Sequence, residues 1–257
     1  MKLSTFLNLP TSEVARLVRD AGTRVAVFPI NGTRRWFMIE HPVDAEGGFS
    51  STYLQVIVQR HVDLYRQFFD CGIDTLLTPA FGPDLLERGE AYMEMVAEGL
   101  THLATHPIFL QFFQEYQVRV KFYGDYAKFF RGTQHDHLLD VFQDVMARTA
   151  GNGRFRLLFG VCAGDATESL AALAVQYYLK HGLVPGRDQL IELYYGEQID
   201  PVNLFIGFDK PCVFDMPLVA TGNDDRYFTV SPSFYLTERH LRRILYDHLY
   251  SRRHVPD

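Results

Sequence analysis

The chain has 257 residues, of which 47% are hydrophobic, with a formal net charge of −6 at pH 7 and a pI of about 5.9. This acidic balance argues against nucleic acid as a partner, and no apolar run is long enough for stable insertion into a membrane. The polar N-terminus does not resemble a signal peptide, and three widely spaced cysteines favour neither a disulfide framework nor a zinc site, so we expect a cytoplasmic protein.

Apolar periodicity and turn residues predict strands that alternate with helices. In chain order, we expect a helix over 11–22, a strand over 25–30, a helix over 51–69, a strand over 73–79, helices over 84–104 and 107–116, a strand over 118–123, a helix over 137–147, a strand over 155–161, helices over 165–181 and 188–195, strands over 204–207 and 226–230, and a basic helix from 237. This alternation predicts an α/β fold, an open, mostly parallel sheet covered by helices on both faces. No repeat or linker divides the chain, so we expect a single domain over 1–257.

The segment 24–37 contains the most informative pattern in the chain. A short apolar strand ends at Asn31-Gly32, which marks a sharp turn, and Arg34, Arg35 and the only tryptophan follow at once. If a helix begins at this turn, its first N–H groups and the positive end of its dipole attract anions. Arginine adds a permanent charge and a fork of donors that suits phosphate oxygens. The alternative is a plain strand–turn–helix join with two solvated arginines, because no strict phosphate-loop spacing is present.

Residues 31–36 (Asn-Gly-Thr-Arg-Arg-Trp) resemble the Asp-Gly-Asn-Gly-Arg-Trp motif that opens the cis-prenyltransferases, which make Z-polyprenyl diphosphates. The likeness is closer to a divergent branch, the tuberculosinol (tuberculosinyl adenosine) synthases, which act on a bicyclic diterpenyl diphosphate. Further segments similar to this branch follow in order along the chain: 122–126, 194–197, 205–208, 227–230 and 241–248. The resemblance implies the cis-prenyltransferase fold, usually as a homodimer.

The resemblance also implies that the turn binds the diphosphate of the substrate. Ionisation of an allylic diphosphate breaks a C–O bond, so the enzyme must neutralise charge on the leaving group, normally with Mg²⁺, arginines and backbone N–H groups. Arg34 and Arg35 match the branch motif and are our first candidates for this role. Gly32 and Thr33 offer backbone donors.

Asn31 is the main departure from the family pattern, because cis-prenyltransferases and the tuberculosinol branch have Asp at this position, where it helps to hold Mg²⁺. Magnesium prefers anionic oxygen ligands and water, and an amide oxygen can ligate only without the charge. Two alternatives follow: Mg²⁺ binds mainly through the substrate phosphates, or the chain relies on arginine and needs metal less. We expect a weakened Mg²⁺ site of the first kind.

Two tyrosines match functional tyrosines of the tuberculosinol branch: Tyr53, early in the helix over 51–69, and Tyr92, on the helix over 84–104. A phenol ring can stabilise a cation, and its hydroxyl can orient a water or bind the diphosphate. The alternative is that both tyrosines are partly buried core residues. Asp84 and Arg88 fall in a segment that lies near the substrate diphosphate in the wider family, although Asp84 also fits a plain helix N-cap.

Several motifs are absent or weak. The Asp-Asp-x-x-Asp motif of ordinary class I terpene synthases and the Asp-x-Asp-Asp motif of protonation-initiated cyclases do not occur. The segment 207–214 lacks the arginine with which chain-elongating cis-prenyltransferases bind isopentenyl diphosphate, so that condensation is disfavoured. His135-Asp136-His137 superficially resembles a metal cluster, but it lies in a polar connection without a partner motif.

The resemblance, together with these absent motifs, implies a diterpene synthase that ionises a bicyclic C20 terpenyl diphosphate of the kolavenyl or tuberculosinyl type and captures the cation with water. One alternative is a transferase that attaches the diterpenyl group to an amine such as adenosine. A second is a non-catalytic partner subunit of a cis-prenyltransferase. The ring skeleton and the carbon attacked depend on cavity shape, which aromatic counts do not determine.

Overall fold

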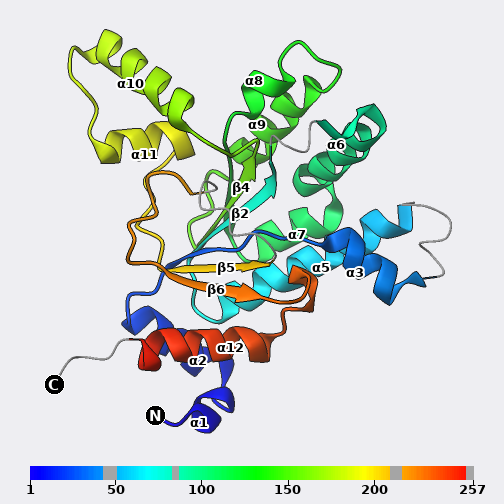
Figure 1. Cartoon of the computed structure of the whole chain (residues 1–257), viewed down its shortest axis with the longest axis vertical. Coiled ribbons are helices and arrows are strands. Elements are labelled where there is room, and N and C mark those ends of the chain that lie inside the picture. The colour runs from blue at the N-terminus through cyan, green and yellow to red at the C-terminus, as the bar shows by residue number, and fades with distance from the viewer. Residues whose placement is uncertain (43–50, 83–86, 209–215, 253–257) are drawn as a thin grey trace. The chain divides into compact units, whose positions relative to one another are not determined.

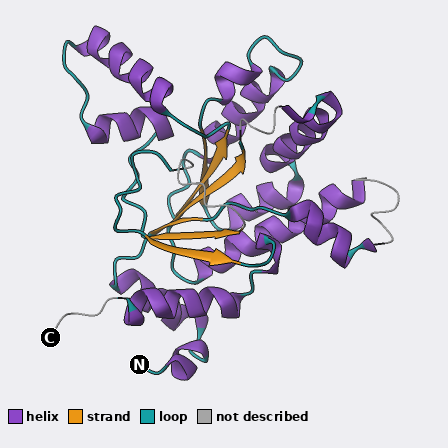
Figure 2. Ribbon diagram, viewed as in Figure 1, coloured by secondary structure: helices purple, strands orange, loops and turns teal. Residues whose placement is uncertain are grey.

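The protein is represented by a computed structural model that describes residues 1–42, 51–82, 87–208 and 216–252. Helices alternate with strands along most of the chain (Figures 1 and 2). In chain order the elements are α1 (Leu3–Leu7), α2 (Thr11–Asp20), β1 (Val25–Val27), α3 (Thr33–Glu40), α5 (Ser51–Asp70), β2 (Thr75–Phe81), α6 (Glu90–Thr105), α7 (Pro107–Glu115), β3 (Val118–Tyr123), α8 (Tyr126–Phe130), α9 (His137–Thr149), β4 (Phe155–Val161), α10 (Thr167–His181), α11 (Arg187–Tyr195), β5 (Leu204–Phe208), β6 (Asp225–Thr229), the 3₁₀ helix η3 (Ser233–Tyr235), α12 (Glu238–Tyr246) and the π-helix η4 (Asp247–Ser251).

The described strands form one six-stranded sheet in the order β3-β4-β2-β1-β5-β6. The pairs β1–β5, β3–β4 and β5–β6 are parallel, and Ala26 of β1 lies opposite Leu204 of β5. Every residue of β1 and β5 is buried, whereas β6 at the sheet edge is nowhere fully buried. Continuous apolar strands are typical of parallel sheets with both faces covered. The predicted open, parallel α/β fold is therefore confirmed.

The chain divides into two compact units. The first contains Met1–Leu76, Val202–Pro211 and Asn223–Asp257, and the second contains Leu77–Pro201 and Cys212–Gly222. The boundary between the units falls inside β2, between Leu76 and Leu77. The single domain expected over 1–257 stays a prediction.

Most of the predicted elements are present with small shifts at their ends. The strands over 118–123 and 155–161 begin and end where the sequence places them, and α5 ends at Asp70, two residues before Gly72 with its φ of +101°. The helix predicted over 11–22 is α2, which begins at Thr11 as expected and ends at Asp20, with Pro10 at the N-cap position. The short helices α1 and α8 are not predicted from the sequence, because five residues are too few to show a helical period. Asp84 lies outside the described residues.

A buried polar chain joins β6 to the C-terminal helices in the first unit. Both ring nitrogens of His248 are hydrogen-bonded: Nε2 to Oγ1 of Thr23 at 2.8 Å, and Nδ1 to Oδ2 of Asp225 at 2.6 Å. A Thr–His–Asp chain is reminiscent of a hydrolase triad, but the Thr23 side chain is completely buried and a substrate cannot reach it. We therefore assign the hydrogen-bonded group of Thr23, His248 and Asp225 to the stability of the fold. Among the described helices, none is both long and apolar enough to cross a membrane.

Candidate active site

The turn after β1 requires a glycine. Gly32 is the N-cap of α3 and has φ +74° and ψ +18°, a left-handed conformation that glycine adopts without steric cost. A Cβ atom at this position would lie 2.9 Å from Cε1 of Phe208 and 3.1 Å from Cβ of Pro232. The predicted Asn-Gly turn is therefore present, and a helix begins directly after it.

Ser233 of η3 holds the backbone of Asn31, the residue that precedes Gly32. The amide N–H of Asn31 donates to Ser233 Oγ at 3.0 Å, and the amide N–H of Ser233 donates to the Asn31 carbonyl at 3.1 Å. The Ser233 hydroxyl donates in turn to the carbonyl of Pro29 at 3.1 Å. Ser233 is only 2% exposed, so these bonds are shielded from water. Sequence reasoning missed this residue, which lies about two hundred positions from the turn.

Both arginines lie in the first turn of α3. Arg34 is partly buried and Arg35 is exposed, with the guanidinium carbon of Arg35 5.7 Å from the ring centroid of Phe208. An α-helix leaves its first N–H groups without acceptors inside the helix and carries a partial positive charge at this end. The two guanidinium groups and the helix N-terminus therefore add their charges at one turn, as the sequence predicts.

Tyr53 is brought to this turn from α5. Its hydroxyl is hydrogen-bonded to Oγ1 of Thr33 at 3.0 Å, and its ring meets the Phe37 ring edge-on, with centroids 5.2 Å apart. Tyr53 is 5% exposed and belongs to a small apolar cluster with Phe37 and Leu54. Both readings of Tyr53 thus describe it in part: the ring is a core residue, and the hydroxyl lies at the predicted diphosphate turn.

Two further residues of α5 hold η3 in place. Arg60 donates from Nε to the carbonyl of Phe234 at 2.9 Å and from Nη2 to the carbonyl of Leu236 at 3.0 Å. The Phe234 ring lies between His61 and Trp36 and meets each edge-on, with centroids 5.0 Å apart. Burial lowers the pKa of His61 to about 4, so its imidazole is neutral at pH 7. Burial also lowers the pKa of Arg60. Half of the residues of α5 are polar, with Arg66 among them, so its sequence offers no signal that singles out Arg60.

The remaining predicted site residues lie in the second unit. Tyr92 is in the first turn of α6, and the guanidinium carbon of Arg88 lies 5.2 Å from its ring centroid, which is a cation–π arrangement. The structure thus groups Asn31, Gly32, Thr33, Arg34 and Arg35 with Tyr53 in one unit, and pairs Arg88 with Tyr92 in the other. The catalytic roles of all these residues stay predictions.

The residues at the turn fit a metal ion that the substrate itself would hold. Asn31 is exposed and offers a neutral amide oxygen, since its backbone N–H and carbonyl already bond to Ser233. Within 1–42, 51–82, 87–208 and 216–252, no three His, Cys, Asp or Glu side chains are grouped so that they could bind a metal ion. Magnesium commonly binds through one or two protein oxygens together with phosphate oxygens and water. This donor set therefore suits the phosphate-held Mg²⁺ that the sequence predicts.

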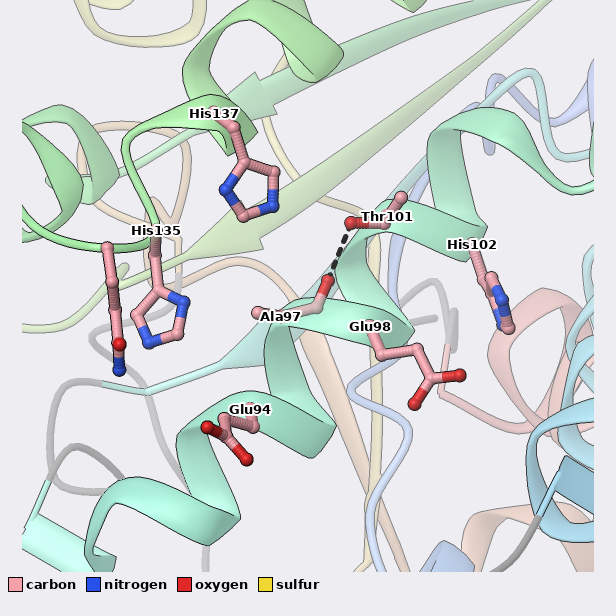
Figure 3. A pocket seen from close by; sticks show the side chains of 8 residues that line it. Glu94, Ala97, Glu98, Thr101, His102, His135 and His137 are labelled. Carbon is pink, nitrogen blue, oxygen red and sulfur yellow. Dashed lines mark hydrogen bonds between the residues drawn. The ribbon is translucent and has the colours of Figure 1, made fainter.

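A separate cavity of about 380 Å³ lies between α6 and the start of α9 in the second unit. Figure 3 shows His135 and His137 on one side of it, whereas Glu98 and His102 of α6 point away from them. The hydroxyl of Thr101 in its wall is already bonded to the carbonyl of Ala97 at 2.8 Å. The described lining contains none of the residues that we predict to bind the diphosphate, so we do not place the active site here.

Replacing Tyr53 with Phe tests the hydroxyl separately from the ring. We expect the variant to lose about 1 kcal/mol of stability, because one hydrogen bond to Thr33 is lost while the packing on Phe37 is kept. If the hydroxyl acts on the substrate, kcat will fall by more than this stability loss explains. Urea unfolding and steady-state kinetics measure the two effects. Thr33→Val removes the other partner, and a double variant no worse than either single one would support a direct coupling.

Two known proteins are similar to the chain over nearly its whole length. The tuberculosinyl adenosine transferase of Mycobacterium tuberculosis is 42% identical over 252 residues, which cover 98% of this chain and 83% of that protein. This chain belongs to the tuberculosinyl adenosine transferase family. A (+)-kolavelool synthase of Herpetosiphon aurantiacus is 25% identical over 254 residues, which cover 98% of this chain and 82% of that protein. The family resemblance predicted from segment 31–36 is thereby confirmed. No family model matches the chain.

Solved structures place this family among proteins with the cis-prenyltransferase fold. The lavandulyl diphosphate synthase of Lavandula x intermedia, in complex with dimethylallyl diphosphate, matches with a TM-score of 0.69 at 15% identity, covering 89% of this chain and 95% of that one. A probable undecaprenyl diphosphate synthase of Campylobacter jejuni matches with a TM-score of 0.61 at 16% identity, with the same two coverages of 89% and 95%. At such low identities these matches support the fold alone.

Proposed function

We propose that this member of the tuberculosinyl adenosine transferase family ionises a bicyclic C20 terpenyl diphosphate and transfers the terpenyl group to an amine, with a nucleoside such as adenosine as the acceptor. The main support is a relative of 42% identity whose name describes this transfer. The first turn of α3 provides the chemistry that the first step needs. There Arg34, Arg35 and the helix N-terminus gather positive charge at one place.

In the proposed reaction, the C–O bond between the terpenyl group and the diphosphate breaks, and its electron pair leaves with the diphosphate. Charge on the leaving oxygen grows as the bond lengthens, so donors already in position stabilise the transition state more than the bound substrate. Arg34 and Arg35 would bind the diphosphate oxygens, together with N–H groups of Gly32 and Thr33. A nitrogen lone pair of the acceptor then forms the new C–N bond.

Magnesium, when bound with the substrate, would neutralise part of the diphosphate charge. The amide oxygen of Asn31 would be its ligand at the turn. Asn31 is fixed in place by the two backbone bonds to Ser233. Aromatic rings are suited to face the resulting cation, and we propose this role for Tyr53 and Tyr92.

Capture of the cation by water is the second candidate, and it would give a diterpene alcohol. The likeness to a (+)-kolavelool synthase favours it, as does the pair of hydroxyl groups on Thr33 and Tyr53 at the diphosphate turn, which could orient a water. That relative is 25% identical to this chain over the aligned residues, against 42% for the transferase. We therefore place the transferase first and the expected water capture second.

A competition experiment separates these candidates. The purified protein is incubated with linear and bicyclic C15 and C20 diphosphates in oxygen-18 water, with and without adenosine, and the products are identified by mass spectrometry. We expect a terpenyl nucleoside to dominate when adenosine is present. An oxygen-18 alcohol as the main product under both conditions would establish water capture instead. If no diphosphate is released from any substrate, the alternative of a non-catalytic partner subunit replaces both.

Asn31→Asp should tighten the dependence on magnesium. Restoring a carboxylate adds an anionic ligand at the turn, and we expect the Mg²⁺ concentration for half-maximal activity to fall on the order of tenfold, equivalent to about 1.4 kcal/mol. The measurement is a Mg²⁺ titration of activity after treatment with chelator. Asn31→Ala is the matched control, because it removes the amide oxygen and leaves both backbone bonds to Ser233. Full activity of the protein with its native sequence in excess chelator would contradict the proposed role of Mg²⁺.

A further inference from the structure

Three polar groups of the backbone before Gly32 share one partner. Residues 28–32 lie between β1 and α3, so their polar groups need partners from elsewhere in the chain. The carbonyl of Pro29, the N–H of Asn31 and the carbonyl of Asn31 are all hydrogen-bonded to Ser233. The serine hydroxyl donates one of these bonds and accepts another, and the serine N–H donates the third. A single residue therefore sets the path of the chain into Gly32.

The segment that leads to this serine is itself anchored to the sheet. The hydroxyl of Thr229, at the end of β6, donates to the carbonyl of Ser231 at 3.1 Å. The Cβ and Cγ atoms of Pro232 lie only 3.1 and 3.3 Å from the position that a Cβ atom on Gly32 would occupy. The start of η3 therefore contacts the turn by packing as well as by hydrogen bonds.

Arg60 of α5 holds the other end of η3. Its guanidinium group donates to the carbonyls of Phe234 and Leu236, which come after Ser233 in the chain. Arg60 is half-buried, and burial lowers its pKa. A charge withdrawn from water is costly unless polar groups satisfy it, so the two carbonyls are favoured where the arginine reaches them. The helix η3 is thus fixed from α5 at one end and bonded to the turn at the other.

We propose that Ser233 is a positioning residue for the turn at 31–35, and that Arg60 acts on this turn through Ser233. The Ser233 side chain is 2% exposed and is bonded twice to the backbone, so it does not touch the substrate. It holds Asn31 so that its amide oxygen and the first N–H groups of α3 are in place before a ligand arrives. Donors already in place stabilise an anion without a cost of rearrangement. This inference rests on the proposed function, because it takes the turn to bind a diphosphate.

The only tryptophan of the chain reports on the contact between η3 and α3. Trp36 lies on α3, and its ring meets the ring of Phe234 edge-on, with centroids 5.0 Å apart. Tryptophan emission depends on the groups around the ring, so a displacement of η3 against α3 will shift it. A loss of stability elsewhere will leave the emission unchanged as long as the protein is folded.

Ser233→Ala is the variant that tests the proposal. It removes the two bonds of the hydroxyl, to Pro29 and Asn31, and keeps the bond of the backbone N–H. The Kd for inorganic diphosphate is measured by isothermal titration calorimetry in the presence of Mg²⁺, and Trp36 emission is recorded on the same samples. We expect the Kd to rise about tenfold or more, because a small misplacement of binding groups is costly. We also expect the emission to shift.

Thr149→Val is the matched control. The hydroxyl of Thr149 is buried in the second unit, where it accepts from the N–H of Val120 at 3.1 Å and donates to the carbonyl of Val145 at 2.8 Å. The control therefore loses the same two kinds of bond as Ser233→Ala, but not at the turn. We expect it to keep the native Kd and the native emission. Circular dichroism confirms that each variant is folded at the temperature of the measurements.

Arg60→Met tests whether the arginine acts through the serine. Methionine keeps an unbranched side chain but donates no hydrogen bond, so the carbonyls of Phe234 and Leu236 lose their bonds to Arg60. We expect the Kd for diphosphate to rise about fivefold, an effect in the range of a single coupled contact. The double variant with Ser233→Ala should bind no more weakly than Ser233→Ala alone. Two effects that multiply in the double variant would overturn the action through Ser233.

The outcomes separate this inference from the proposed function. If Ser233→Ala keeps the native Kd and the native emission, the inference is overturned, while diphosphate binding and terpenyl transfer by the native chain stand. A native chain that binds diphosphate with the help of this serine but forms no terpenyl product overturns the function and leaves the positioning role intact. A native chain that does not bind diphosphate overturns both.

Discussion

Replacing Arg34 or Arg35 with alanine is expected to slow diphosphate release by about 100- to 1,000-fold, the usual effect of removing one group that stabilises a transition-state charge. Both side chains lie at the first turn of α3, where the helix N-terminus adds to their charge. Because the leaving group gains charge as the C–O bond breaks, the loss should appear mainly in kcat rather than in KM. Measuring released diphosphate under saturating substrate gives kcat directly.

The corresponding lysine variants distinguish charge from geometry. Lysine keeps the positive charge but lacks the planar fork of donors that binds two phosphate oxygens together. We expect Arg34→Lys and Arg35→Lys to recover part of the activity, with the smaller recovery at whichever arginine binds the diphosphate in a bidentate manner. Arg239→Ala serves as a control, because this exposed arginine lies on α12 and outside the turn. If the alanine variants matched that control, the turn would be a plain structural join.

Gly32→Ala is expected to disturb both stability and activity. A residue other than glycine in the left-handed conformation costs about 1–3 kcal/mol, and the new Cβ atom would press on Phe208 and Pro232 at 2.9 and 3.1 Å. The proline ring cannot rotate away, and the Phe208 ring lies beneath the guanidinium group of Arg35. We therefore expect the start of α3 to shift and kcat to fall about tenfold or more, since small misplacements of binding groups are costly.

Gly22→Ala is a closely matched control for this change. Gly22 has the same φ of +74°, but nothing lies within 4 Å of an added Cβ atom. The two variants share the backbone cost, so the difference in their free energies of unfolding measures the steric contact alone. Urea unfolding with kinetics on each variant provides the comparison. Equal stability losses, with activity retained in Gly32→Ala, would contradict a site built around this glycine.

Local sequence patterns predicted much of the fold because the interactions they report are local. Segments of five to seven residues rich in Val, Leu, Ile and Phe place β3, β4 and β5. Thr237 caps α12 by accepting a bond from the His240 N–H at 3.2 Å, as expected of a residue before a helix. The ends of helices are placed less accurately. The helix predicted over 188–195 begins at Arg187, with Gly186 at the N-cap position and Asp188 in the first turn.

The sequence by itself determined the family and the turn at which we propose that the diphosphate binds, because residues 32–35 are contiguous and one turn of α-helix is enough to bring the charges of Arg34 and Arg35 together. Only the tertiary structure decided what surrounds that turn. Ser233, Phe208 and Arg60 come from distant positions, and it is the order of the strands and the packing of α5 that bring them to it. Tyr53 and Tyr92 look alike in the sequence, yet one is bonded to Thr33 and the other is paired with Arg88. Such contacts depend on chain path rather than on spacing, and local periodicity carries no information about them.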